Sequence, residues 1–259
     1  MEIAILYQDE QLVAVHKPSG LLVHRSPLSR DRVYLLQTLR DQLGRRLYPV
    51  HRLDRATSGV LVFAFDAETA HALNQAFTEQ RVEKTYLAIV RGWPEPPEGH
   101  IDRPVRDDDR EAHREAASDY RRLATATLPV ANRRYPTSRY ALVGLWPKTG
   151  RRHQLRIHME RISYPIIGDT THGDGEHNRI FREHLGLDRL MLHALSLRLP
   201  HPAEPDQILD LRAQPGDQFA LALERLGMAE ISEIFCGKIL EWESASGAKQ
   251  ANHIREGRT

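Results

Sequence analysis

Strand-like apolar segments outnumber helical ones in this chain of 259 residues, and they do not alternate with helices in a regular repeat. Runs of β-branched, aromatic and aliphatic residues predict strands at 3–7, 12–16, 60–65, 82–90, 140–146 and 190–199. Helical spacing predicts helices at 31–43, 153–161 and 217–226, and a further helix that Asp66 caps. This order favours an α+β fold over a doubly wound parallel sheet.

Two stretches lack a clear apolar period. Residues 94–139 are polar, rich in proline and include a charge run, so we expect a long polar excursion with an irregular strand or two, within one domain over 1–243. Residues 244–259 have little to bury and are expected to be disordered. The net charge is only +1, but residues 203–245 hold nine acids against three bases, which leaves a basic body. That distribution is compatible with nucleic acid binding or with ordinary surface charge.

Several classes of protein are disfavoured by residues that the chain lacks. Cys236 is the only cysteine, so an intrachain disulfide and a cysteine-rich zinc site are excluded. Its start is not a signal peptide, and no run of about 20 apolar residues could span a membrane, so we expect a cytoplasmic protein. No phosphate-binding or dinucleotide glycine motif occurs. A lone Glu68–His71 pair gives no reason to expect a metal.

The run His51–Gly59 places Asp54 between Arg52 and Arg55, ahead of a Thr-Ser-Gly turn. Nearby cations favour the charged form of a carboxylate, so Asp54 is expected to stay ionised. In a chain with other basic clusters, such a carboxylate fits a nucleophile or base that acts on a polyanion. A purely structural ion pair is the more common alternative.

Two further clusters carry chemically useful side chains. In the first, Tyr86 follows Lys84 within a predicted strand, where it fits either a core aromatic or a functional group. In the second, Arg151, Arg152 and His153 stand at the start of a predicted helix. Cations at a helix N-terminus oppose its dipole, which indicates that they serve an external anion unless they are only solvated.

Taken together and in order, the clusters resemble the RluA-type pseudouridine synthases. That family has His-Arg-Leu-Asp, Lys-x-Tyr and Gly-Arg-x-His-Gln-Leu-Arg-x-His motifs, found here at 51–54, 84–86 and 150–158. Similar lead-in and later segments at 15–20, 166–169 and 190–194 extend the resemblance over about residues 3–202. The resemblance implies a mixed, largely antiparallel sheet with flanking helices around a central RNA cleft, and an isomerase that needs no cofactor.

The resemblance also implies roles for single residues. Asp54 is the expected catalytic aspartate, Tyr86 stacks on the target base and assists proton removal, and Arg156 pairs with Asp54. Asp54 either attacks C1′ or takes a proton from C2′, and the sequence does not choose. The expected RNA contacts are cationic side chains of the three clusters: Arg52, which would fill the space of the flipped base, with Arg55, Lys84, Arg151, Arg152 and His153.

Within the family, the N-terminal segment and the 94–139 excursion most resemble enzymes that modify uridine 65 of tRNA, in the acceptor/T-stem region. We therefore expect a bare catalytic domain that works as a monomer, with tRNA as its partner and without metal or membrane. A ribosomal-RNA or dual-specificity synthase and a non-catalytic RNA-binding protein are the alternatives. A glycoside hydrolase would need a second carboxylate, and only Glu83 lies in the three clusters.

Overall fold

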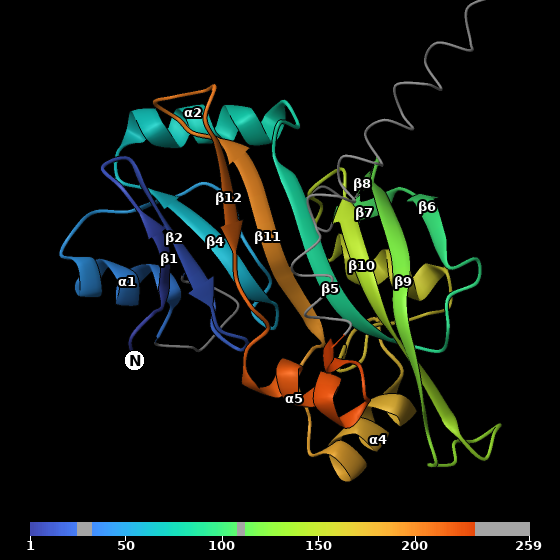
Figure 1. Ribbon diagram of the computed structural model, residues 1–259. Coiled ribbons are helices and arrows are strands. Elements are labelled where there is room, and N and C mark those ends of the chain that lie inside the picture. The colour runs from blue at the N-terminus through green and yellow to red at the C-terminus, as the bar shows by residue number, and fades with distance from the viewer. Residues whose placement is uncertain (25–32, 108–111, 231–259) are drawn as a thin grey trace, which may run out of the picture.

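The computed structural model describes residues 1–24, 33–107 and 112–230, and it confirms an α+β fold (Figure 1). A mixed, mostly antiparallel ten-stranded sheet has the order β1–β2–β4–β11–β5–β10–β9–β6, with β3 paired to β4 and β12 to β11. These strands are β1 Ile5–Gln8, β2 Leu12–Lys17, β3 Tyr48–Pro49, β4 Ser58–Ala64, β5 Glu83–Arg91, β6 Glu98–Asp102, β9 Ala117–Leu128, β10 Ser138–Pro147, β11 Leu192–Pro200 and β12 Ile208–Arg212. The helices are α1 Leu35–Leu43, α2 Ala67–Thr78, α3 Gln154–Arg161, α4 Gly175–Leu185 and α5 Asp217–Arg225.

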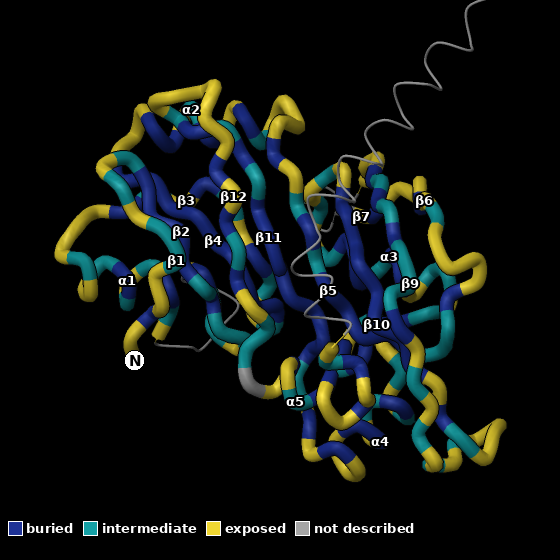
Figure 2. The backbone as a smooth tube through the Cα atoms, viewed as in Figure 1, coloured by how far each residue is buried: buried dark blue, intermediate teal, exposed yellow. Residues whose placement is uncertain are grey.

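Helices cover both faces of the sheet where it contains β2 and β4. Successive strand residues point to opposite faces, and Leu39 of α1 packs with Val15 and Phe63 on one of them. On the other face, Leu73 of α2 packs in the cluster that holds Val62. Burial on both faces explains why β4 is apolar without alternation, and Figure 2 shows its buried course.

The second half of the molecule is built on β5, β10 and β11, against which the apolar faces of α3, α4 and α5 pack in one core cluster. Asp66 caps α2 as predicted, since its carboxylate accepts a hydrogen bond of 2.7 Å from the Thr69 amide. No helix in the described part of the chain is long and apolar enough to cross a membrane.

Residues 94–139 are more regular than the predicted excursion with an irregular strand or two. β9 is a twelve-residue strand that pairs along β10, β6 pairs with β9, and β7 Val105–Asp107 forms a hairpin with β8 Ala112–Arg114. The sequence of β9 has no clear apolar alternation. The strand lies toward the sheet edge, where side chains are only partly buried and polar residues are tolerated.

Helix α4 was not predicted, although Asp174 caps it and Gly186 ends it in a left-handed conformation. The expected start of the first helix at Asp31 and the expected disordered tail at 244–259 lie outside the described residues.

Candidate active site

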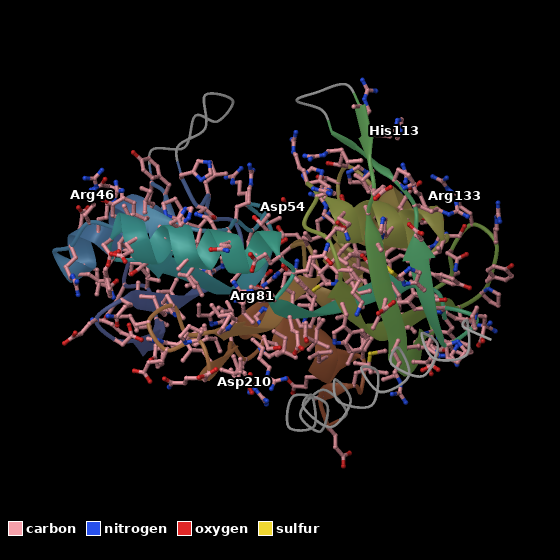
Figure 3. The ribbon with its side chains drawn as sticks, turned by 90° about the horizontal axis from the view of Figure 1, so that it is seen from above. Arg46, Asp54, Arg81, His113, Arg133 and Asp210 are labelled. Atoms are coloured by element: carbon pink, nitrogen blue, oxygen red, sulfur yellow. The ribbon has the colours of Figure 1, made fainter. Side chains whose placement is uncertain are left out.

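A pocket of about 610 Å³ lies between the loop that precedes β4, the C-terminal end of α2, strand β5 and the turn that leads into α3. Every predicted site residue except Arg55 lines it: Arg52, Asp54, Lys84, Tyr86, Arg151, Arg152, His153 and Arg156. Figure 3 shows Asp54 between the half of the molecule that carries α1 and α2 and the half that carries the β7–β8 hairpin. The three sequence clusters therefore meet at one place.

Arg156 joins two carboxylates at the base of the pocket. Its Nη1 donates to Asp54 Oδ2 at 3.2 Å, while Nε and Nη2 donate to the two oxygens of Asp169 at 2.6 and 2.7 Å. Burial alone would raise the pKa of the Asp169 carboxyl, but the hydrogen bond from Arg156 and those from backbone amides hold it below its usual value. Asp169 thus holds the Arg156 guanidinium, which donates its remaining N–H group to Asp54.

Tyr86 lies in the middle of the sheet, on β5, opposite Ala194 of β11 and Leu145 of β10. Burial, and secondly the negative charge of Asp54, raise the pKa of its phenol well above the usual value. Tyr86 is therefore a neutral phenol whose ring lines the pocket close to Asp54.

A wall of cationic side chains faces the pocket from β5 and the turn before α3. Burial, and secondly Arg151, lower the pKa of the Lys84 ammonium to about 8. His153 is in a left-handed conformation (φ 55°) directly before α3, and its Nε2 lies 3.8 Å from Asp54 Oδ2. Such a concentration of cations suits a phosphate backbone.

Arg55 is placed differently from its predicted partners, since its Nε donates to the Gly20 carbonyl at 3.0 Å. Beneath it, the fully buried Lys17 donates from Nζ to the carbonyls of Pro18, Leu21 and Arg55 at 2.9, 2.8 and 3.0 Å. Burial lowers the pKa of Lys17 to about 7. These contacts connect the loop that carries Asp54 to the turn after β2, so Lys17 and the Arg55 side chain have a structural role here.

The pocket also contains residues that the sequence did not single out. Asn74, Phe77, Thr78 and Gln80, from the end of α2 and the turn after it, also line the pocket. No sequence motif marks these four residues, because three belong to an ordinary amphipathic helix and Gln80 to the turn that follows it. Within the described ranges, no group of three or more His, Cys, Asp or Glu side chains is arranged to hold a metal ion.

Known proteins with similar sequences are described as pseudouridine synthases. Residues 11–161 match the family described as RNA pseudouridylate synthase. A protein of Vibrio cholerae named tRNA pseudouridine synthase C is 48% identical over 239 residues, which cover 87% of this chain and 96% of the relative. The protein of that name from Pasteurella multocida is 49% identical over 219 residues, covering 80% and 90%.

Solved structures show the same fold. Human RNA Pseudouridylate Synthase Domain Containing 4 aligns with a TM-score of 0.67 at 29% identity, over 86% of this chain and 93% of the other. Human RNA Pseudouridylate Synthase Domain Containing 1 aligns with a TM-score of 0.66 at 24% identity, over 83% and 84%, which bears on the fold alone. The chain belongs to the RNA pseudouridylate synthase family and is an RluA-type RNA pseudouridine synthase, an isomerase.

Proposed function

We propose that this enzyme converts a uridine of tRNA, at position 65 in the acceptor/T-stem region, to pseudouridine, with Asp54 as the catalytic carboxylate. The name shared by the bacterial relatives supports tRNA as the substrate. The main support for the proposed active site is that Asp54, Tyr86 and Arg156 line one pocket. We further propose a catalytic domain over 1–243 that works as a cytoplasmic monomer without a metal.

The reaction breaks the N1–C1′ bond, turns the uracil and joins C5 to C1′. The base must first leave the helical stack, at a cost of roughly a few kcal/mol. The pocket is within the range of about 300–1,000 Å³ usual for small-molecule sites, so it can receive a flipped nucleoside. Asp54 then attacks C1′ or removes the C2′ proton, and Arg156 stabilises the carboxylate charge that either step requires.

Tyr86 is proposed to stack on the target base, which returns about 1–3 kcal/mol. Because its phenol is neutral, it can take up the C5 proton only as its own hydroxyl proton leaves. Asp54, whose charge acts on this phenol, is a suitable acceptor.

The cationic residues are proposed to hold the RNA. Arg52 is exposed at the pocket and would occupy the space of the flipped base. Lys84, Arg151 and Arg152 would contact phosphates as cations, because they line the same pocket. His153, whose partly buried ring has a lowered pKa, would contact the RNA beside them as a polar group. Arg55 is proposed as a contact outside the pocket, on its exposed side.

The test is to incubate the purified protein with unmodified tRNA and ribosomal RNA transcripts and to map pseudouridine, with Asp54→Asn in parallel. We expect product at one acceptor/T-stem uridine, absent with the variant. Product only on ribosomal RNA would refute the substrate and keep the chemistry. Undiminished product with Asp54→Asn would refute the proposed role of Asp54.

A further inference from the structure

Polar contacts around Asp54 close into a ring that passes through four other side chains and one backbone amide. Arg156 donates to Asp54 and to Asp169, and Asp169 Oδ1 accepts from the backbone amide of His172 at 2.9 Å. The ring of His172 contacts His153, with Nε2 and Nδ1 3.1 Å apart, and His153 Nε2 returns to Asp54 at 3.8 Å. Asp54 is thus approached from two sides, and both approaches lead back to Asp169.

Asp169 fixes the first approach. Asp169 is 2% exposed, and its carboxylate engages Arg156 through two parallel N–H···O bonds. Bidentate pairing holds a guanidinium in one plane, which a single contact does not. The remaining nitrogen, Nη1, is thereby directed at Asp54.

Asp169 also supports the second approach, because it holds the backbone amide of the residue whose ring contacts His153, namely His172. Burial lowers the pKa of both His153 and His172, so both rings are neutral near pH 7. In a contact between neutral imidazoles, one nitrogen donates and the other accepts. When His172 Nε2 donates to His153 Nδ1, the proton of His153 is on Nε2 and faces Asp54. The opposite tautomers would direct a lone pair at the carboxylate.

The backbone around Asp169 is held as closely as its side chain. Asn178 of α4 accepts from the Gly168 amide at 2.7 Å and donates to the Asp169 carbonyl at 2.8 Å. Gly168 has φ +78°, and a Cβ there would lie 1.9 Å from the Arg189 carbonyl oxygen. A Cβ at Gly173 would lie 2.0 Å from the Asp169 carbonyl oxygen. Helix α4 and two close approaches therefore set the position of one carboxylate.

We propose that Asp169 is a positioning residue of the isomerisation: through Arg156 and through His172 it aims two N–H groups at Asp54. This rests on the role proposed for Asp54. Asp169 does not line the pocket, so it acts on the reaction through its partners and not by binding RNA.

The test compares Asp169→Asn with Asp174→Asn. Asp174 is a matched control, because it also accepts from two backbone amides, those of Glu176 and His177, and pairs with an arginine, Arg91, but outside the pocket. Pooled tRNA and ribosomal RNA transcripts serve as substrate, so that a wrong choice of RNA still yields a rate. We expect Asp169→Asn to lower kcat at least tenfold with RNA Kd within twofold, and Asp174→Asn to leave both nearly unchanged. Equal losses of kcat in the two variants would overturn the proposal.

Two further measurements guard against loss of fold or of substrate. If Asp169→Asn does not fold, His172→Phe, at a half-buried position, replaces it: a lower kcat at unchanged Kd supports the proposal, and an unchanged kcat overturns it. The second measurement is an NMR spectrum of the histidine side chains, recorded without RNA. We expect the His153 resonances to shift in Asp169→Asn and not in Asp174→Asn. If His153 is unaffected, Asp169 does not position it and the proposal fails.

Discussion

At the scale of single residues, Arg156 is expected to matter for stability as well as for turnover. Arg156→Ala leaves the buried Asp169 without its cation, and removing one partner of a buried pair typically costs about 3–5 kcal/mol. We expect a lower free energy of unfolding, measured by urea denaturation, together with loss of pseudouridine product. Arg91→Ala, which breaks the more exposed pair with Asp174, should cost less and keep activity. Full activity with an unchanged melting temperature in Arg156→Ala would rule out Arg156 as the residue that supports both the fold and Asp54.

The two proposed tasks of Tyr86 can be separated. Tyr86→Phe keeps the ring and removes the hydroxyl, so RNA should bind within twofold of wild type while kcat falls by about 10²-fold or more, as for lost proton transfer. Tyr86→Leu also removes the stacking surface and should weaken binding by about 1–3 kcal/mol. Filter binding and single-turnover rates measure the two effects. Normal turnover in Tyr86→Phe would exclude a role of the hydroxyl in proton transfer and leave base stacking as the only proposed role of Tyr86.

At the scale of elements, the parallel contact between β4 and β11 depends on Gly59. This residue has φ +120°, and a Cβ would lie 2.0 Å from the Ala194 carbonyl oxygen. We expect Gly59→Ala to destabilise the protein by more than about 3 kcal/mol, since backbone strain and a clash with a buried strand combine. Gly44→Ala, at φ +62° with open space around it, should cost only about 1 kcal/mol. Equal thermal shifts in the two variants would contradict this account.

The elements also show what the sequence could predict and why the rest stayed hidden. β4 and α2 were recognised because one is buried on both faces and the other has a cap and an apolar stripe. β9 and α4 were not, because each buries only part of its surface and its local pattern is polar. The motifs named Asp54, Tyr86 and the arginines of the pocket but not the residues that α2 contributes. The link from Asp169 through His172 to His153 depends on folding that sequence spacing does not reveal.

At the scale of the whole molecule, the pocket lies between the two halves of one continuous sheet, and its cations other than Arg52 come from the half that carries β5 and α3. Phosphate contacts release counterions, so affinity for RNA should fall as salt rises, with a slope set by the number of contacts. Reversing Arg151 and Arg152 to Glu should weaken binding of every RNA and reduce the slope by about 1 per lost contact.

Arg179→Glu is the control for this last prediction, because Arg179 is an exposed cation on α4, which contributes no residue to the pocket. It changes net charge without touching the cationic wall, so the slope should stay that of wild type. Binding isotherms at several salt concentrations separate the cases, because a general effect of net charge would also change the slope in Arg179→Glu, by about half as much as in the double reversal. A slope unaltered by reversal at Arg151 and Arg152 would mean that the RNA backbone is held elsewhere, and the 94–139 segment would be the next to reverse.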